Sequence, residues 1–533
     1  MNNGNVGTLI LSAALRHPQR LALRIPRPGE GLTSDSLSYA ELLGYAARLQ
    51  QALQADGWQS GQRVLLLARP GLPLYAVLLA LLGLGLVPVL LDRGMSRARM
   101  LGAIAASGAS GLIGQRDIVK RWWLLPQLWR LRRYCLDGAC FGARGLPPDA
   151  GQCGLTNYQF LPRGNDDHGL ISFTSGSTGA PKGADRTHAS LIAQHLAIRS
   201  HWPDQDDEID MPCFPVLVLH NLCCGISSVL PAVDLATPGQ VDAALVLEQI
   251  QREGITRLSG APAYMQRLVE HAQANGLQLP QVRSLVVGGS TVNQALLHGC
   301  LRSFPQARAR VVYGSTEAEP IAEVEMSELL QDWHQQPGYL LGNPAAVADV
   351  CIVDPQLPLS DGASVERARL PAGRVGEILV AGPHVLKAYV DNPQACAECK
   401  IPRADSLVWH RTGDCGAFDP QGRLWLHGRL KDRVLINGRA QDSFILEKAL
   451  DAVPGIIRSA VLNALDGQPL VVLQGEPQQA EQLPAVLKQF DITRAWLARI
   501  AQMPVDGRHN SKIDRPALRQ ALKNRQLACE ALP

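Results

Sequence analysis

The segment Ile171–Gly183, with the sequence ISFTSGSTGAPKG, constrains the fold of this 533-residue chain more than any other. It begins with apolar residues suited to a strand and continues at once into glycines, hydroxyl residues and one lysine. Glycines let backbone N–H groups approach an anion, hydroxyls donate hydrogen bonds, and lysine supplies a compact positive charge. The segment therefore predicts a strand that ends in a phosphate-binding loop. The residues expected to contact phosphate are Thr174, Ser175, Gly176, Ser177, Thr178, Gly179 and Lys182.

This loop differs from the common Walker A nucleotide loop. There the lysine opens a helix and is followed by Ser or Thr, whereas Lys182 lies between Pro181 and Gly183. The loop instead resembles that of the adenylate-forming superfamily, which contains acyl-CoA synthetases, luciferases and the adenylation domains of peptide synthetases. The resemblance implies an enzyme that activates a carboxylic acid with ATP and Mg²⁺ and releases pyrophosphate.

Composition narrows the class of protein further. Single cores rarely grow beyond about 250–300 residues, so this length predicts at least two domains. The net charge of +3 gives no general case for binding nucleic acid. The 12 cysteines lack the spacing of a disulfide framework, and the N-terminus lacks the pattern of a signal peptide. We therefore expect reduced thiols and a cytoplasmic enzyme.

Two segments bear on membrane contact. Leu74–Leu91 approaches the length of a membrane span, but glycines and Pro88 interrupt it. Because apolar residues 64–67 precede it, we interpret the region as strand, buried helix and strand, with no transmembrane segment. The second segment, Lys120–Tyr134, mixes arginines with tryptophans and leucines. A partly buried surface helix is favoured there, and an interfacial helix that contacts a membrane is the alternative.

Strand and helix patterns alternate along much of the chain, which is typical of parallel sheets covered by helices. Ligands of such sheets bind at the carboxyl ends of the strands. The YGSTE sequence at 313–317 follows one apolar strand, and there an aromatic ring can stack on a base, a hydroxyl can donate to phosphate, and a carboxylate can hold Mg²⁺. The residues expected at this edge are Gly289, Tyr313, Gly314, Thr316 and Glu317.

Later motifs complete the predicted site. Asp414 in RTGD offers two carboxylate oxygens to the hydroxyls of a ribose, and Arg429 in GRLKD can reinforce that contact. The resemblance implies that Lys431 is a hinge. It also implies that Lys512 contacts both the substrate carboxylate and the α-phosphate, which would spread the growing negative charge. The expected catalytic residues are Lys512, Glu317 and Lys182, and Glu317 is the expected metal ligand.

The predicted fold is α/β. A large N-terminal domain of several subdomains with parallel-type sheets, residues 1–430, is expected to bind ATP and the acyl substrate. A small mobile α+β lid, residues 431–533, is expected to carry the catalytic lysine. Apolar residues 214–219 and 260–264 are expected to form the acyl pocket, with Gly260 at a position where a bulky side chain would shorten it.

The acceptor of the activated acyl group is left open. Several segments resemble the β-lactone synthetases of olefin pathways, in which the β-hydroxyl of the acyl chain closes a ring without CoA. They include FPVLVL at 214–219, YGSTEAEP at 313–320 and PVDGRHNSKI at 504–513. The hinge sequence GRLKDRVLINGR is closer to that of CoA ligases. A fatty acyl-CoA ligase, or a freestanding ligase that loads an acyl carrier protein, is therefore the alternative.

Overall fold

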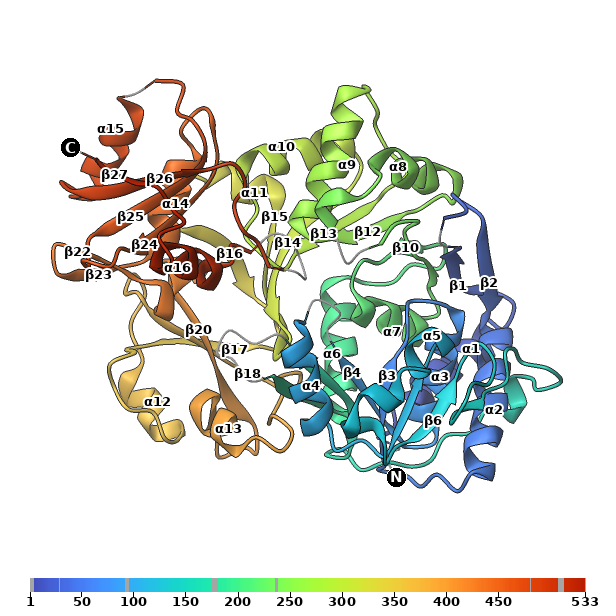
Figure 1. The fold of residues 1–533 in the computed structure, drawn as a ribbon. Helices are drawn as coiled ribbons and strands as arrows, with labels where there is room; N and C mark the ends of the chain where they lie inside the picture. The colour runs from blue at the N-terminus through green and yellow to red at the C-terminus, as the bar shows by residue number, and fades with distance from the viewer. Residues whose placement is uncertain are drawn as a thin grey trace.

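The computed structural model describes residues 4–27, 29–91, 95–174, 181–234, 238–479, 481–506 and 512–532. Within these residues the chain forms two large sheets, a four-stranded sheet near the C-terminus and a two-stranded ribbon. The C-terminal sheet and its helices form a separate lobe beside the body of the molecule (Figure 1). The predicted α/β class, with a small C-terminal unit, is confirmed.

The first large sheet carries the predicted phosphate-loop strand. Its strands pair in parallel except for β8 and β9, an antiparallel pair that flanks the loop sequence. The predicted strand at 64–67, and the buried helix and strand predicted within Leu74–Leu91, are confirmed as β3, α3 (Leu72–Gly83) and β4. The strand order of the described residues is β7 (Arg144–Gly145), β6 (Arg132–Cys135), β5 (Gly111–Gly114), β3 (Arg63–Leu67), β4 (Val87–Leu91), β8 (His168–Thr174) and β9 (Lys182–Thr187).

The second large sheet is mixed. Its strands from β1 and β10 to β14 pair in parallel, whereas those from β14 to β21 pair antiparallel, so the expectation of parallel-type sheets holds only for its N-terminal part. The order is β17 (Asp349–Val353), β18 (Gly376–Ala381), β20 (Val408–Phe418), β21 (Leu424–Arg429), β16 (Tyr339–Pro344), β15 (Ala318–Glu325), β14 (Arg308–Ser315), β13 (Ser284–Gly288), β12 (Arg257–Gly260), β10 (Ile209–Met211), β11 (Ser227–Val229), β1 (Leu21–Pro26) and β2 (Ser34–Ser38), with β19 (Lys400–Pro402) paired to β20.

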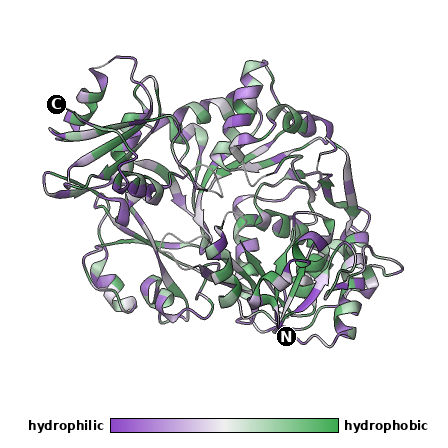
Figure 2. Cartoon of the chain, in the orientation of Figure 1, coloured by the Kyte–Doolittle hydropathy of each residue, from purple (hydrophilic) through white to green (hydrophobic). Residues whose placement is uncertain are grey.

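Helices α1 (Gly7–Arg16), α2 (Tyr39–Ala55), α3 and α7 (Pro215–Cys224) share one hydrophobic core with both large sheets. The core joins Leu23 of β1 to Leu66 of β3, and Figure 2 shows that hydrophobic residues are frequent in this part of the body. Helix α2 begins at Tyr39 because Ser38 and Glu41 cap its first turn reciprocally. This shared core fixes the two sheets relative to each other.

The other helices of the body pack against one sheet each, apart from α6 (His188–His201), which contacts strands of both large sheets. The core on the second sheet includes residues of α8 to α11, and a smaller one on the first sheet includes residues of α4. These helices are α4 (Arg97–Ala106), α5 (Arg116–Val119), α6 (His188–His201), α8 (Ala243–Arg252), α9 (Pro262–Ala274), α10 (Gln294–Ser303), α11 (Met326–Gln331), α12 (Gly362–Ala368) and α13 (Pro393–Cys399).

The C-terminal lobe has its own hydrophobic cores on both faces of its sheet. Lys448 joins the lobe to the body, because its ammonium group donates to the carbonyls of Trp333 at 2.6 Å and Gly338 at 2.5 Å. The elements of the lobe are β22 (Val434–Ile436), β23 (Arg439–Gln441), α14 (Ser443–Asp451), β24 (Ile456–Asn463), β25 (Pro469–Gly475), α15 (Gln482–Gln489), β26 (Ala495–Ile500), α16 (Arg515–Lys523) and β27 (Cys529–Leu532). The boundary at 430/431 stays a prediction.

The expectation of a helix at Lys120–Tyr134 is wrong. The segment forms two short 3₁₀ turns, at 122–124 and 126–128, and then β6. Pro126 interrupts the backbone pattern, and the guanidinium group of Arg133 donates to three carbonyls of the segment. Trp123 and Trp129 are consequently exposed, at 61% and 56%.

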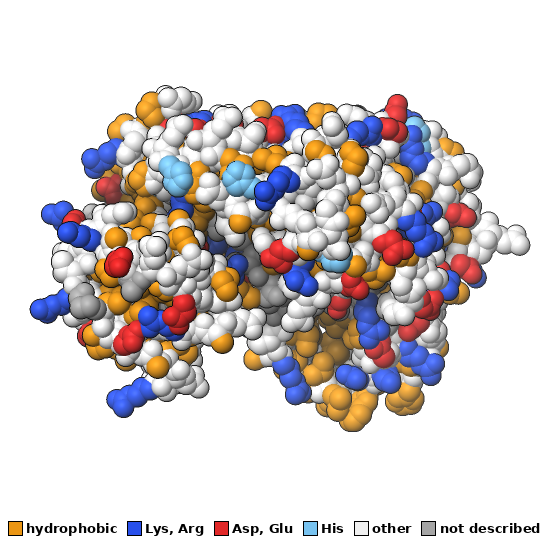
Figure 3. Space-filling view, turned by 90° about the horizontal axis from the view of Figure 1, so that it is seen from above, with side chains coloured by type: hydrophobic (Ala, Val, Ile, Leu, Met, Phe, Trp, Pro, Cys, Tyr) orange, Lys and Arg blue, Asp and Glu red, His pale blue; other side chains and the backbone are white. Residues whose placement is uncertain are grey.

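The lengths of the helices and the side chains on the surface are relevant to contact with a membrane or with other molecules. Among the described residues, no helix combines the length and the apolar character needed to cross a bilayer. The face seen in Figure 3 carries basic and acidic side chains interspersed. Hydrophobic side chains also reach the surface along one edge of that view.

Candidate active site

A cleft of about 2440 Å³ lies where the carboxyl ends of the central strands of the body meet the C-terminal lobe. Predicted residues from the body and from the C-terminal lobe line this one cleft. Ser175, Gly176, Ser177, Thr178, Gly179 and the side chain of Thr174 lie outside the described residues. The predicted residues that line the cleft are Lys182, Gly289, Tyr313, Gly314, Thr316, Glu317, Asp414, Arg429, Lys431 and Lys512.

Asp414, Arg429 and Tyr313 form a connected group on one wall. Asp414 and Arg429 are direct partners on β20 and β21. The Arg429 Nε donates to Asp414 Oδ1 at 3.2 Å, and the Tyr313 hydroxyl donates to Asp414 Oδ2 at 2.7 Å. The Asp414 carboxylate also raises the pKa of Arg429. The carboxylate is thus held from two sides and faces the cleft, where it can accept hydrogen bonds from a diol.

Glu317 lies between β14 and β15, and the Tyr389 hydroxyl donates to its Oε1 at 2.9 Å. Burial disfavours the charged form of this carboxyl group. Nearby basic side chains and the hydroxyl hydrogen bond outweigh that effect and lower the pKa of Glu317. The basic side chains belong to His410 and Lys400. Because burial lowers the pKa of His410 to about 3 and that of Lys400 to about 8, the lysine supplies the positive charge near neutral pH.

Lys182 begins β9 and lies near the ring of Tyr389. Its Nζ is 5.3 Å from the centroid of the Tyr389 ring and donates to the Cys399 Sγ at 3.7 Å. The Nζ of Lys400 is 5.6 Å from the same centroid and has no hydrogen-bond partner among the described residues. Two ammonium groups therefore lie close to one aromatic ring next to Glu317. The Lys182 ammonium lines the cleft and can attract an anion there.

Sequence reasoning did not find Tyr389, Lys400 and His410. They lie 72 to 93 residues after Glu317 in the chain, on or near β19 and β20. His410 immediately precedes the RTGD motif but was given no role, and no motif marks Tyr389 or Lys400. The pairing of β19 with β20, which places Lys400 opposite His410, brings the two side chains together. Only a prediction of that strand pairing could have identified them.

Lys512 lies on the C-terminal lobe and faces the same cleft. Its backbone is held against Asp506: the Lys512 N–H donates to Asp506 Oδ1 at 3.0 Å, and the Asp506 N–H donates to the Lys512 carbonyl at 2.8 Å. An isolated bridge between Val505 and Ile513 adjoins this pair. These contacts fix the backbone of a lysine that lines the cleft from the C-terminal lobe.

The predicted hinge lies in a short 3₁₀ turn, Leu430–Asp432. Asp432 is buried and accepts from Arg519 at 2.8 Å, and it is 3.5 Å from Arg515. Both arginines belong to α16, so the turn is anchored to the C-terminal lobe immediately after Lys431. Rotation about this residue would move the lobe and its anchor together.

With the fold and the geometry described, the comparisons define the class of protein. Residues 11–390 match the family model of the AMP-binding enzymes, and the chain belongs to that family. It is an adenylate-forming acid ligase, and enzymes of this class use ATP.

Among characterised relatives, the chain is similar to the olefin beta-lactone synthetase of Stenotrophomonas maltophilia, with 31% identity over 96% of this chain and 97% of the relative. It is also similar to a feruloyl-CoA synthase of Amycolatopsis sp, with 30% identity over 93% of this chain and 92% of the relative. Among solved structures, ATP-bound MatB from Rhodopseudomonas palustris has a TM-score of 0.79 and 21% identity, over 98% of this chain and 99% of that chain. The latter similarity supports the fold alone.

Proposed function

We propose that this protein activates a β-hydroxy fatty acid as its acyl-adenylate and converts it to a β-lactone. The similarity to an olefin beta-lactone synthetase over nearly the whole of both chains carries the proposal. In the first step a carboxylate oxygen attacks the α-phosphorus of ATP, and pyrophosphate leaves. In the second, the β-hydroxyl oxygen attacks the acyl carbon, the bond to AMP breaks, AMP leaves with the electron pair, and the hydroxyl proton passes to solvent.

The apolar wall of the cleft supports a fatty substrate. Phe214, Val216, Leu217 and Leu219, from α7 and the residue before it, line the cleft. Gly260 does not belong to the lining as described, which corrects the expectation for that residue. A Cβ at this position would lie 2.6 Å from Tyr264 Cδ1, so a larger side chain would disturb the core rather than shorten the pocket.

The residues of the cleft suggest roles in the first step. Lys182 and the neighbouring loop would hold the β- and γ-phosphates, Asp414 would accept from the ribose hydroxyls, and Tyr313 would pack on the base. Lys512 would contact the substrate carboxylate and the α-phosphate at the same time. Fixed donors aimed at developing charge stabilise a transition state more than a ground state.

Glu317 fits a role as the Mg²⁺ ligand. Its carboxylate faces the cleft, and its lowered pKa keeps it ionised. Mg²⁺ is commonly held by one or two carboxylates together with substrate phosphates, so one such group is an adequate protein donor. When bound, the ion would neutralise charge on the phosphates.

We expect Glu317→Gln to raise the Mg²⁺ concentration needed for half-maximal adenylation by at least about tenfold, the lower end of the loss seen when outer-shell partners of metals are removed. The amide keeps the shape of the side chain but removes its charge. Pyrophosphate release at varied Mg²⁺ measures the effect. Tyr389→Phe is the matched control, because it removes the hydrogen bond and keeps the carboxylate. An unchanged Mg²⁺ requirement in Glu317→Gln would contradict the role.

The second candidate function is a fatty acyl-CoA ligase, or a ligase that loads an acyl carrier protein. It is favoured by the GRLKDRVLINGR sequence and by the similarity to a feruloyl-CoA synthase. In that case the thiol sulfur of the acceptor replaces the β-hydroxyl as nucleophile.

One experiment separates these functions. The enzyme receives ATP and Mg²⁺ with a 3-hydroxy fatty acid or the same acid without the hydroxyl, each with and without CoA or an acyl carrier protein. For a β-lactone synthetase we expect AMP and lactone from the hydroxy acid alone, with turnover unaffected by CoA. Acyl thioester from both acids, and no lactone, would establish the ligase instead.

Peripheral membrane contact is a further part of the proposal. Trp123, Leu124, Trp129 and Phe141 form an exposed apolar patch, since the Trp129 indole donates to the Trp123 carbonyl and the Trp122 indole to that of Phe141. The basic residues Lys120, Arg121 and Arg130 next to it are also exposed. Tryptophans beside basic residues favour the interface of an anionic bilayer.

We expect the protein to sediment with vesicles that contain an anionic lipid, and the double variant Trp123→Ser/Trp129→Ser to remain in the supernatant. The matched control is Trp333→Phe, because Trp333 is buried. Equal sedimentation of all three proteins, or none by the unaltered protein, would remove the membrane proposal while leaving the ligase chemistry intact.

A cytoplasmic location remains part of the proposal and rests on 12 cysteines that are all free thiols.

A further inference from the structure

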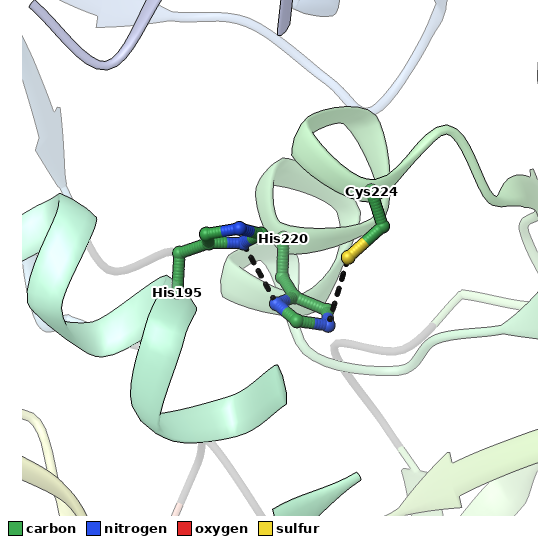
Figure 4. Close-up of side chains that lie close together, drawn as sticks. All are labelled: His195, His220 and Cys224. Carbon is green, nitrogen blue, oxygen red and sulfur yellow. Dashed lines mark hydrogen bonds between the residues drawn. The ribbon is translucent and has the colours of Figure 1, made fainter. Parts of the chain in front are cut away.

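Two helices of the body bring two histidines and a cysteine together away from the predicted ATP and carboxylate contacts. His195 lies on α6, and His220 and Cys224 lie on α7. His195 Nδ1 is 3.1 Å from His220 Nδ1, and Cys224 Sγ is 3.6 Å from His220 Nε2. Figure 4 shows the three side chains converging between the helices. Because His220 and Cys224 are four residues apart, they lie on one face of α7.

The protonation states of the cluster suit metal binding. All three residues are buried, with exposed fractions of 6%, 2% and 8%. Burial lowers the pKa of His195 to about 4 and that of His220 well below its usual value, so both imidazoles are neutral, the form that binds metals. Burial raises the pKa of Cys224 to about 12, so its thiol stays protonated until a metal displaces the proton.

We propose that His195, His220 and Cys224 form a binding site for a thiophilic d¹⁰ cation, Zn²⁺ or Cu⁺. Two imidazoles and a thiolate are a donor set that both ions accept. Each residue can offer one donor atom such that all three lie within 4.8 Å of one another. Zn–N bonds of about 2.0–2.1 Å and a Zn–S bond of about 2.3 Å require donor separations of roughly 3.4–3.6 Å, so modest side-chain rotation closes the site.

The two imidazoles of the cluster border a small cavity. Its volume is about 10 Å³, and it is lined by His195, His220 and Cys223 but not by Cys224. This volume is at the lower limit for one water molecule, so a fourth ligand on the imidazole side could be at most one water. The other walls of the cavity include Val6, Leu191 and Ile198, so this side of the cluster is largely apolar.

A metal ion at this site would affect the wall of the cleft. Residues 215–219 of α7 line the cleft, while His220 and Cys224 lie further along the same helix. An ion that joins α6 to α7 would therefore fix a helix that forms the wall for the acyl chain. Without an ion, the same three groups can form a hydrogen-bonded chain from the thiol through His220 to His195. That chain is the alternative that the experiment must separate from the metal site.

The test uses the full chain purified without a histidine tag, together with Cys224→Ala, His195→Ala and the control Cys223→Ala. Cys223 is the adjacent buried cysteine and is not a member of the cluster. Metal content after incubation with Zn²⁺ or, under reducing conditions, Cu⁺ is measured by mass spectrometry. Affinity is measured against a chromophoric chelator. Co²⁺ serves as a spectroscopic probe, since thiolate ligation gives a near-ultraviolet charge-transfer band.

We expect one ion per chain in the unaltered protein and in Cys223→Ala, with a raised thermal midpoint on loading and a thiolate–cobalt band. Cys224→Ala should lose the band, and both cluster variants should bind more than about 10- to 100-fold more weakly, since even loss of an outer-shell partner has that effect. The preferred ion identifies the cation. Binding that is absent in the unaltered protein, or equal in all four proteins, would overturn the site and leave the hydrogen-bonded chain.

Discussion

Lys512→Ala is expected to lose nearly all acyl-adenylate formation and to retain the second step. Lys512 faces the cleft from the C-terminal lobe, across from Asp414 and Glu317 on the body. A positively charged donor placed at the developing charge of the α-phosphate contributes about 3–4 kcal/mol, which corresponds to about 10²–10³-fold in rate. The second step does not need this contact, because the acyl–phosphate bond has already formed.

The two steps are measured separately. Pyrophosphate release from ATP and the acid reports the first step, and AMP release from synthetic acyl-adenylate reports the second. Lys523→Ala is the matched control, since Lys523 is an exposed lysine at the end of α16 in the same lobe. Equal losses in both steps for Lys512→Ala would show that the lysine only holds the nucleotide or the fold.

The same pair of assays tests the mobile lid, which is still a prediction. The lobe is held to the body through Lys448, and its first turn is anchored by Asp432. If the lobe rotates between the steps, Lys431→Pro should slow the second step more than the first, because proline fixes the backbone torsion at the pivot. If Lys431→Pro lost only the first step, the expected larger effect on the second step would be contradicted.

The site was predictable where one short segment contains both the residue and its structural context. Asp414 and Arg429 were found because tight motifs mark them, and their contact follows from the pairing of β20 and β21. Lys400 was missed, because its relation to Glu317 arises only when distant strands pair. A buried amine has no sequence signature, and burial is a property of the whole fold.

In the fold, too, some segments were predictable from local sequence and others were not. Helix 39–55 was predictable because a local capping pair begins it and an apolar face continues it. The segment 120–134 was not, because the interactions of Arg133 with nearby carbonyls, and with the Trp122 ring at 4.0 Å, replace helical hydrogen bonds. Local propensity was decisive only where no such side-chain interaction competed with it.

Arg515→Met is expected to unfold the C-terminal lobe without unfolding the body. Arg515 donates from Nη2 to both oxygens of Glu447 at 2.6 Å and from Nη1 to the Val461 carbonyl at 3.0 Å. Both charged side chains are buried, with exposed fractions of 6% and 8%. Removing one partner leaves an uncompensated buried charge, which costs about 3–5 kcal/mol. Adenylation should fall as well, because Lys512 belongs to this lobe.

The loss of stability of the C-terminal lobe in Arg515→Met should depend on pH in a defined direction. Burial raises the pKa of Glu447 to about 7, and Arg515 opposes that shift. Without the arginine, the folded-state pKa rises further above the unfolded value. A carboxyl group with a raised folded-state pKa stabilises the fold less as the pH increases from its unfolded-state pKa to its folded-state pKa. The variant should therefore be less destabilised at pH 6, where Glu447 can be neutral, than at pH 8.

Hydrogen exchange of the full chain at both pH values measures this effect in β24 and β25, with peptides of β3 and β4 as the internal reference for the body. Arg519→Met is the matched control: its side chain is 41% exposed, and such partly exposed bridges are typically worth about 0–1 kcal/mol. The double variant Arg515→Met/Glu447→Leu should recover much of the loss, because it removes the unpaired charge and leaves an apolar pair. Equal destabilisation by the two arginine variants, or no recovery in the double variant, would show that packing of the arginine rather than its buried ion pair holds the lobe together.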